Sequence, residues 1–161
     1  MEIERKFRID HLPEQLEQYP HTHLVQGYLS TEPVVRVRQD GEQYILTYKG
    51  SGLMTREEYN LPLTRASYEH LLQKADGILI DKIRYRIPLD PYIIELDVFS
   101  GAHEGLSLAE VEFSSEEEAH AFVPPQWFGE EVTFDGRFHN SYLSTHPLST
   151  QENLSTGGTH A

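Results

Sequence analysis

The chain has 161 residues, of which 38% are hydrophobic and 24% are charged, and these values fit a single globular domain. Its formal net charge of −13 argues against a generic nucleic-acid-binding protein, because such proteins rely on positive charge. No apolar run is long enough to cross a bilayer, and the first seven residues lack the apolar segment of a signal peptide, so we expect no membrane partner. The absence of cysteine excludes disulfides and thiolate metal sites, and it favours a cytoplasmic location.

Charged and apolar residues alternate with a period of two over much of the chain, which predicts β-strands. The expected strands are Met1–Ile9, Val25–Ser30, Val34–Gln39, Glu42–Lys49, Met54–Leu61, Leu79–Pro88, Tyr92–Phe99 and Leu108–Phe113. Asp40 and Gly41 predict a tight hairpin between the third and fourth of these strands. We therefore expect a mainly β (α+β) fold: an eight-stranded antiparallel closed β-barrel, or tunnel, with a few covering helices.

One helix is expected between the strands, from Thr64 to Asp76, because apolar residues there recur at i, i+3, i+4 and i+7. Thr64 suits its N-cap, and Gly77 suits the left-handed residue that would end it.

Two further helices are expected in the last third of the chain. Ser115–Glu118 has the pattern of a capping box, which predicts a short helix ending at Phe122. A last helix is expected from about Arg137 to Thr145. Residues 147–161 are polar and have almost no core-forming side chains, so we expect a domain over residues 1–146 followed by a disordered tail.

The strand residues separate by parity, with charged side chains on one face and apolar side chains on the other. The charged set is Glu2, Glu4, Lys6, Arg36, Arg38, Lys49, Arg56, Glu58, Lys82, Arg84, Arg86, Glu95, Asp97, Glu110 and Glu112. For any single strand the commoner explanation is a one-sided sheet with its charged face in water. However, the signs are segregated by strand, with RVR and KIRYR basic and ELD and EVE acidic, whereas a solvated face usually mixes them. This segregation favours a charged barrel interior.

Such an interior would have a specific chemistry. Inward-facing lysine and arginine neutralise a polyanion, and the guanidinium group matches phosphate oxygens bidentately. Clustered carboxylates repel one another unless a cation lies between them, and oxygen-only ligand sets favour hard ions such as Mg²⁺ or Mn²⁺. Acidic and basic strands around one cavity therefore suit metal-assisted phosphoryl transfer to water.

The N-terminal sequence Glu2-Ile3-Glu4-Arg5-Lys6 resembles the ExExK signature of the CYTH superfamily, the triphosphate tunnel metalloenzymes. Matching motifs follow in the family's order: Arg36-Val37-Arg38, Thr47-Tyr48-Lys49, Arg56-Glu57-Glu58-Tyr59, Lys82-Ile83-Arg84-Tyr85, Glu95-Leu96-Asp97 and Glu110-Val111-Glu112. The resemblance extends over residues 1–146. Within the superfamily, the chain looks most like the bacterial short-form inorganic tripolyphosphatases.

The resemblance implies an eight-stranded tunnel, dependence on a divalent metal and a substrate that carries a triphosphate. The metal ligands it implies are Glu2, Glu4, Glu95, Asp97, Glu110 and Glu112. The phosphate-binding residues it implies are Lys6, Arg36, Arg38, Lys49, Arg56, Lys82 and Arg84. The catalytic residues it implies are Glu2, Glu4, Tyr28, Lys49 and Lys82. Tyr28 resembles the tyrosine that some members pair with the lysine matching Lys49, although its position equally suits an ordinary aromatic residue of the barrel wall.

Three functions remain compatible with this pattern. The first is hydrolysis of inorganic tripolyphosphate to pyrophosphate and phosphate. The second uses an organic triphosphate, either as a thiamine-triphosphatase or as a class IV adenylate cyclase. The third is a non-catalytic polyphosphate-binding module, which would need the basic strands but not the full set of carboxylates. A homodimer is expected only by analogy with the family.

Overall fold

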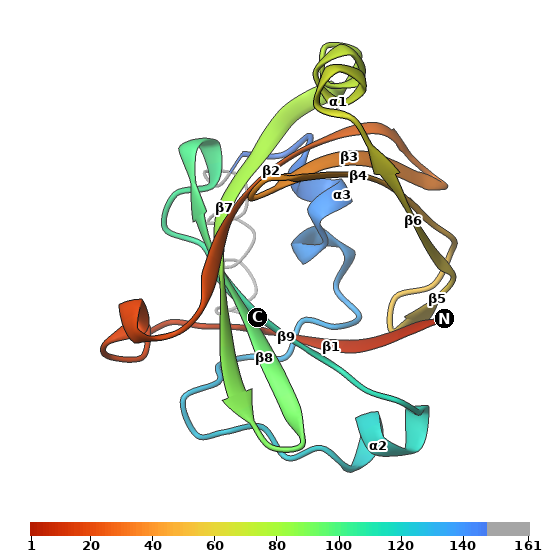
Figure 1. Cartoon of the computed structure of the whole chain (residues 1–161). Helices are drawn as coiled ribbons and strands as arrows, with labels where there is room; N and C mark the ends of the chain where they lie inside the picture. The colour runs from red at the N-terminus through yellow and green to blue at the C-terminus, as the bar shows by residue number, and fades with distance from the viewer. Residues whose placement is uncertain (148–161) are drawn as a thin grey trace.

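The computed structural model of the protein describes residues 1–147, in which nine antiparallel strands curve into a nearly closed barrel (Figure 1). The strands are β1 Glu2–Arg8, β2 His21–Thr31, β3 Val34–Asp40, β4 Gln43–Lys49, β5 Thr55–Arg56, β6 Glu58–Leu63, β7 Asp76–Leu89, β8 Tyr92–Ser100 and β9 Ser107–Glu112. Their order around the barrel is β5-β1-β9-β8-β7-β2-β3-β4-β6. The expected barrel architecture is confirmed.

The strand count is nine rather than eight because the expected strand Met54–Leu61 is divided at Glu57. β5 pairs with β1, whereas β6 pairs with β4, so the chain changes partner between them. These two strands are the edges of the sheet, and the one residue between them closes the ring covalently. The carbonyl oxygen of Glu57 also accepts a hydrogen bond from Gly50 N at 3.0 Å, which fixes this corner.

The register places the two parities of each strand on opposite sides of the barrel wall. Lys6, Arg36, Arg38, Lys82 and Arg84 are buried on the inner side. The apolar parity of β1, β8 and β9 packs outward against α2 and the segment that follows it, in a core that includes Ile9, Met54, Ile87, Ile94, Leu96, Ala109, Val111, Phe113 and Ala119. The alternative of a one-sided sheet with a solvated charged face is therefore wrong.

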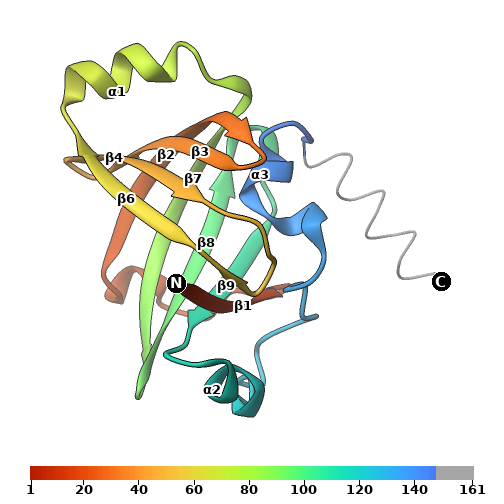
Figure 2. The ribbon, with the colours of Figure 1, turned by 90° about the vertical axis from the view of Figure 1, so that its right-hand side faces the viewer.

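Helix α1 (Arg65–Leu72) covers the outer side of β2, β3 and β4 (Figure 2). Thr64 is its N-cap as expected, because its hydroxyl accepts a hydrogen bond from Ser67 N at 3.0 Å. The helix ends at Leu72, so the expectation that Gly77 terminates it is wrong. Gly77 lies in β7 with φ of +71°, and a Cβ there would approach the carbonyl oxygen of Ser144 to 2.3 Å. Glycine is thus required by a tertiary contact rather than by a helix end.

Helix α2 (Glu116–Ala121) starts at Ser115, whose side chain accepts from Glu118 N at 3.1 Å. The reciprocal half of the expected capping box is shifted by one residue, since the Glu118 carboxylate accepts from Ser114 N. Arg5 fastens this helix to β1 by donating to the carbonyl oxygens of Ala119 and Phe122, each at 2.9 Å.

The C-terminal part of the described chain closes one end of the barrel (Figures 1 and 2). The helix expected from Arg137 to Thr145 is shorter: a 3₁₀ turn (Gly136–Phe138) is followed by α3 (Asn140–Leu143), with extended backbone at His139 between them. Phe138 and Leu143 insert into a second apolar cluster with Tyr28, Val34, Ile80, Phe99, Leu106, Leu108 and Val132. We call residues 138–146 the plug.

Two further 3₁₀ turns, Leu16–Gln18 and Gly101–His103, complete the described elements. None of the helices in residues 1–147 has the length and apolar character needed to cross a membrane. Apart from residue 147, the tail expected to be disordered, residues 147–161, lies outside the described residues.

Candidate active site

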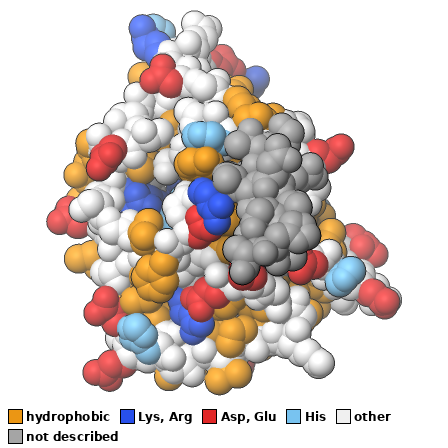
Figure 3. All heavy atoms as spheres, turned by 180° about the vertical axis from the view of Figure 1, so that it is seen from behind, with side chains coloured by type: hydrophobic (Ala, Val, Ile, Leu, Met, Phe, Trp, Pro, Cys, Tyr) orange, Lys and Arg blue, Asp and Glu red, His pale blue; other side chains and the backbone are white. Residues whose placement is uncertain are grey.

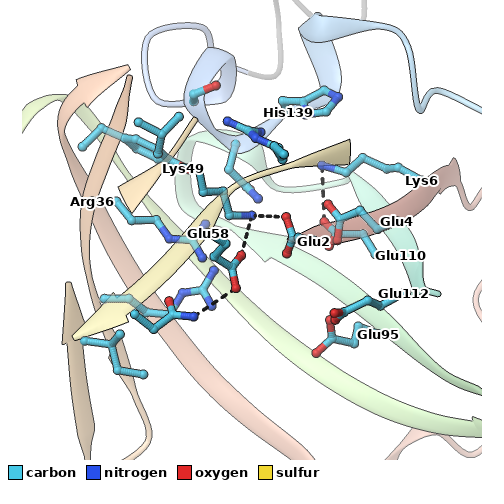
Figure 4. A pocket seen from close by; sticks show the side chains of 18 of the residues that line it. Glu2, Glu4, Lys6, Arg36, Lys49, Glu58, Glu95, Glu110, Glu112 and His139 are labelled. Carbon is cyan, nitrogen blue, oxygen red and sulfur yellow. Dashed lines mark hydrogen bonds and ion pairs between the residues drawn. The ribbon is translucent and has the colours of Figure 1, made fainter. Parts of the chain in front are cut away.

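A cavity of about 230 Å³ lies inside the barrel, with its floor formed by the plug. Figure 4 shows charged side chains from several strands converging on this space. Its lining is almost entirely polar: Glu2, Glu4, Lys6, Tyr28, Val34, Arg36, Arg38, Ile45, Lys49, Arg56, Glu58, Asn60, Arg84, Glu95, Glu110, Glu112, His139, Asn140 and Ser141. The structure thus gathers most of the residues singled out by the sequence into one site.

One side of the cavity is an acidic wall, which we define as Glu2 and Glu4 of β1, Glu95 of β8, and Glu110 and Glu112 of β9. The strand register brings them together, since Glu4 pairs with Glu112 across β1 and β9, and Glu95 pairs with Glu110 across β8 and β9. Alternation in each strand directs these side chains to the same face of the sheet. Carboxylates from three strands therefore line one side of the cavity, with Glu2 and Glu110 buried and Glu112 exposed at the rim.

The acidic wall is electrostatically strained. Burial, together with the charges of Glu110 and Glu2, raises the pKa of Glu4 well above its usual value. Burial also raises the pKa of Glu2 to about 7 despite the neighbouring Lys49. At the rim, burial and the charge of Glu58 raise the pKa of Glu112. The positive charge near these carboxylates does not offset the effect of burial, so their pKa values stay above the usual value.

Two lysines neutralise part of the acidic wall. Lys49 Nζ lies 2.9 Å from Glu2 Oε1 and 3.3 Å from Glu58 Oε2, and Lys6 Nζ lies 3.3 Å from Glu110 Oε1 (Figure 4). Although burial opposes it, the charges of Lys6 and Arg84 hold the pKa of Glu110 well below its usual range. Within residues 1–147, no three carboxylate or imidazole groups already stand at the mutual spacing of a metal site.

The acidic wall nevertheless fits a divalent cation. All of its donors are oxygens, which hard ions prefer. Burial is the main cause of the raised pKa values of Glu2 and Glu4, with the charges of Glu110 and Glu2 adding to it at Glu4, and a divalent cation beside these carboxylates would favour their ionised forms. The residues best placed to hold such an ion are therefore Glu2, Glu4, Glu110 and Glu112, with Glu95 beside them.

The facing side of the cavity is a basic wall, which we define as Arg36 and Arg38 of β3 and Arg56 of β5. Arg38 Nε donates to Gln26 Oε1 at 2.7 Å, and Arg56 Nε donates to the Gly50 carbonyl oxygen at 3.2 Å. Arg36 Nε is buried and has no hydrogen-bond partner. In the described part of the chain, none of the three has a carboxylate within 4.0 Å.

Unpaired arginines in a buried wall destabilise one another. Burial and the charges of Arg36 and Arg84 lower the pKa of Arg38 to about 9. A polyanion between the two walls would satisfy these guanidinium groups, and its oxygens match their planar geometry. The basic wall is therefore prepared for an anion that the protein itself does not supply.

Two of the residues expected at the site lie behind its lining rather than in it. Lys82 and Asp97 are fully buried, and Lys82 Nζ lies 2.7 Å from Asp97 Oδ2. Arg84, which does reach the cavity, donates to both oxygens of Asp97, from Nε at 2.7 Å and from Nη2 at 2.9 Å. Asp97 thus has its oxygens occupied by two cations.

Tyr28 reaches the cavity from β2 but is 2% exposed and belongs to the apolar cluster beneath the plug. Its hydroxyl accepts a hydrogen bond from Gln26 Nε2 at 3.4 Å. No hydrogen bond joins it to Lys49 in residues 1–147, where Lys49 Nζ donates to Glu2 instead.

The sequence pattern did not single out the floor residues His139, Asn140 and Ser141. They follow an irregular segment without strand alternation, so no periodicity marked their direction. Glu58 and Asn60, at the rim, were visible as one strand face but had no assigned role.

Figure 3, a view from behind the barrel, shows acidic side chains spread over the outer surface with fewer lysines and arginines among them. The negative net charge is therefore compatible with an anion site, because the cations concentrate inside.

Comparison with known proteins agrees with this architecture. An inorganic triphosphatase of Nitrosomonas europaea is 43% identical over 149 residues, which cover 89% of this chain and 96% of that protein. An inorganic triphosphatase of Acetivibrio thermocellus is 37% identical over 129 residues, covering 76% and 80%. A crystal structure of an inorganic triphosphatase superposes with a TM-score of 0.68 and 39% identity over 91% of this chain and 95% of the other. Residues 1–145 match the CYTH domain, and the chain therefore belongs to the CYTH domain family.

Proposed function

We propose that this protein is a metal-dependent triphosphate hydrolase whose substrate is inorganic tripolyphosphate, cleaved to pyrophosphate and phosphate. The observation that carries the proposal is the division of one cavity into an acidic wall fit for a hard cation and a basic wall of unpaired arginines. The similarity to two proteins named inorganic triphosphatase supports the choice of substrate. The lack of cysteine supports action in the cytoplasm, and homodimer assembly stays a prediction.

In this proposal the basic wall binds the phosphate groups and the acidic wall binds the metal ion. Arg36, Arg38 and Arg56, with Arg84 beside them, bind and orient the phosphate groups, and negative charge builds on the oxygen of the leaving group as its bond to phosphorus breaks. Glu2, Glu4, Glu110 and Glu112, with Glu95, hold Mg²⁺ or Mn²⁺. When bound, such an ion polarises the phosphoryl group and lowers the pKa of a water molecule.

The lysines connect the two walls. Lys49 and Lys6 neutralise carboxylates of the acidic wall while lying in the same cavity as the arginines. A bound polyanion offers both ammonium groups a second partner, so they can contribute to phosphate binding and stabilise the transferring group. Lys82 and Asp97 support the site from behind by fixing Arg84.

The deciding experiment measures phosphate release from tripolyphosphate, ATP, thiamine triphosphate, pyrophosphate and long-chain polyphosphate, with Mg²⁺, with Mn²⁺ and with excess EDTA. Tripolyphosphate should be the best substrate and pyrophosphate a poor one, and EDTA should abolish turnover reversibly. A strong preference for an organic triphosphate would overturn the substrate assignment. Undiminished turnover in EDTA would overturn the role of the metal.

A further inference from the structure

The floor of the cavity is built by a short segment that the rest of the barrel holds in place. His103, fully buried, directs Nε2 at the carbonyl oxygens of Leu143 and His146, at 2.7 and 2.9 Å. Ile78 N donates to the carbonyl oxygen of Ser144 on the far side of the plug. Ser144 N donates to the carbonyl oxygen of Asn140 at 3.0 Å, so the fixed C-terminal end of the plug also holds the backbone at its start.

Among those first residues, Asn140 has an orientation determined by its neighbour. Asn140 is 9% exposed and lines the cavity, and its Oδ1 lies 3.4 Å from Lys82 Nζ. Lys82 Nζ donates this hydrogen bond and the amide oxygen accepts it, so the oxygen of the amide faces Lys82. The amide nitrogen, with two hydrogens to donate, then faces away from Lys82.

A second asparagine in the same cavity, Asn60, has hydrogen-bond partners for both the oxygen and the nitrogen of its amide. Asn60 Oδ1 accepts from Thr47 Oγ1 at 2.6 Å, and its Nδ2 donates to Glu58 Oε1 at 2.9 Å. Asn140 has a partner for its oxygen only, and within residues 1–147 its Nδ2 has no acceptor. It is not a fully enclosed unsatisfied group either, so its donor side meets the cavity.

We propose that Asn140 is a substrate-binding residue whose Nδ2 donates a hydrogen bond to an oxygen of the terminal phosphate at the closed end of the cavity. The inference rests on the proposed function, because it takes the occupant to be a triphosphate. Lys82 acts through Asn140 as a positioning residue, because its ammonium group fixes which end of the amide faces the substrate. A neutral donor suits this floor, since another cation would add to the repulsion among Arg36, Arg38 and Arg84.

The test compares Asn140→Ala and Asn140→Asp with the matched control Ser144→Ala. Ser144 is fully buried in the plug and its hydroxyl donates to the Ser141 carbonyl oxygen at 2.7 Å, but it does not line the cavity. Binding of tripolyphosphate is measured by calorimetry in EDTA, so the result does not depend on turnover. KM and kcat with Mg²⁺ and the melting temperature are measured in parallel.

Asn140→Ala should weaken tripolyphosphate binding by about tenfold to a hundredfold, as expected for a hydrogen bond to a charged group, and KM should rise more than kcat falls. Asn140→Asp can still pair with Lys82 and should fold, but it turns an oxygen toward the phosphate and should bind more weakly than Asn140→Ala. Ser144→Ala should lower the melting temperature and leave affinity unchanged.

Wild-type affinity in Asn140→Ala would overturn the inference, and so would an equal loss of affinity in Ser144→Ala. If the wild-type protein binds tripolyphosphate without hydrolysing it, the proposed function fails while the binding data still decide the role of Asn140. If it binds tripolyphosphate neither in EDTA nor with Mg²⁺, both proposals fail.

Discussion

The acidic and basic walls face the same cavity but balance their charges differently. On the acidic wall, Glu2 and Glu110 each have a lysine within 3.3 Å, so part of the charge is neutralised by the protein itself. On the basic wall, Arg36 has no partner for a buried Nε, and Arg38 has only the neutral Gln26. The difference indicates that the basic wall can bind an external anion. Without one, its buried guanidinium groups lower the stability of the folded chain.

The largest effect should come from the acidic wall. Glu4→Gln preserves the shape of the side chain but removes a charge from the proposed metal site, so kcat for tripolyphosphate should fall by about a thousandfold or more. The raised pKa of Glu4 means that the folded protein disfavours the charged form of this carboxylate. The melting temperature of the Glu4→Gln variant in EDTA should therefore not fall below that of the wild-type protein. Steady-state kinetics and thermal denaturation check the two parts, and normal kcat would remove Glu4 from the site.

Substitution of the buried residues behind the two walls should change the free energy of unfolding. Asp97→Asn leaves Lys82 and Arg84 buried beside a neutral group, which should cost about 3–5 kcal/mol of unfolding free energy. Arg36→Met is the contrasting variant, because it removes a buried cation that has no ionic partner, and its stability should stay equal or rise. Urea denaturation measures both, and a similar loss in the two variants would contradict the distinction between paired and unpaired cations.

A smaller kinetic effect should follow from the basic wall. Arg38→Ala removes a guanidinium group that binds phosphate oxygens in both the ground state and the transition state, so KM should rise about tenfold or more with a smaller fall in kcat. A loss confined to kcat would show that Arg38 acts only in the transition state. Wild-type kinetics would place the substrate elsewhere.

A pH-dependent effect concerns the floor that joins the walls. Burial and the charge of Lys6 lower the pKa of His139 to about 4 from 6.5, so the unfolded chain binds more protons than the folded one between these values. Stability from this group is therefore lost as the pH falls. Between pH 7 and pH 5 the wild-type protein should lose about 2 kcal/mol more than His139→Asn. Urea denaturation at both pH values tests this, and parallel losses would contradict it.

Alternation along the strands predicted one charged and one apolar face per strand, because side chains of an extended chain alternate by necessity, and the segregation of signs by strand predicted that the charged face lies inside the barrel. Local chemistry likewise determined the start of α1, since Thr64 needs only Ser67 N three residues away. Sequence could not show the division of Met54–Leu61 into β5 and β6, because the change of partner at Glu57 depends on where β1 and β4 lie. The reason for Gly77 was equally hidden, since the atom it makes room for belongs to Ser144.

The candidate site likewise combines features that follow from local sequence with features that depend on tertiary contacts. The sequence by itself determined which charges face the interior, because parity and sign can be read along each strand. Only the tertiary structure decided which of them remain available to a ligand. Asp97 and Arg36 have the same inward parity, yet Asp97 is enclosed by Lys82 and Arg84 while Nε of Arg36 has no hydrogen-bond partner among residues 1–147. The plug brings Asn140 beside Lys82, 58 residues away in the chain, and no periodic pattern can encode a contact between a strand and an irregular segment.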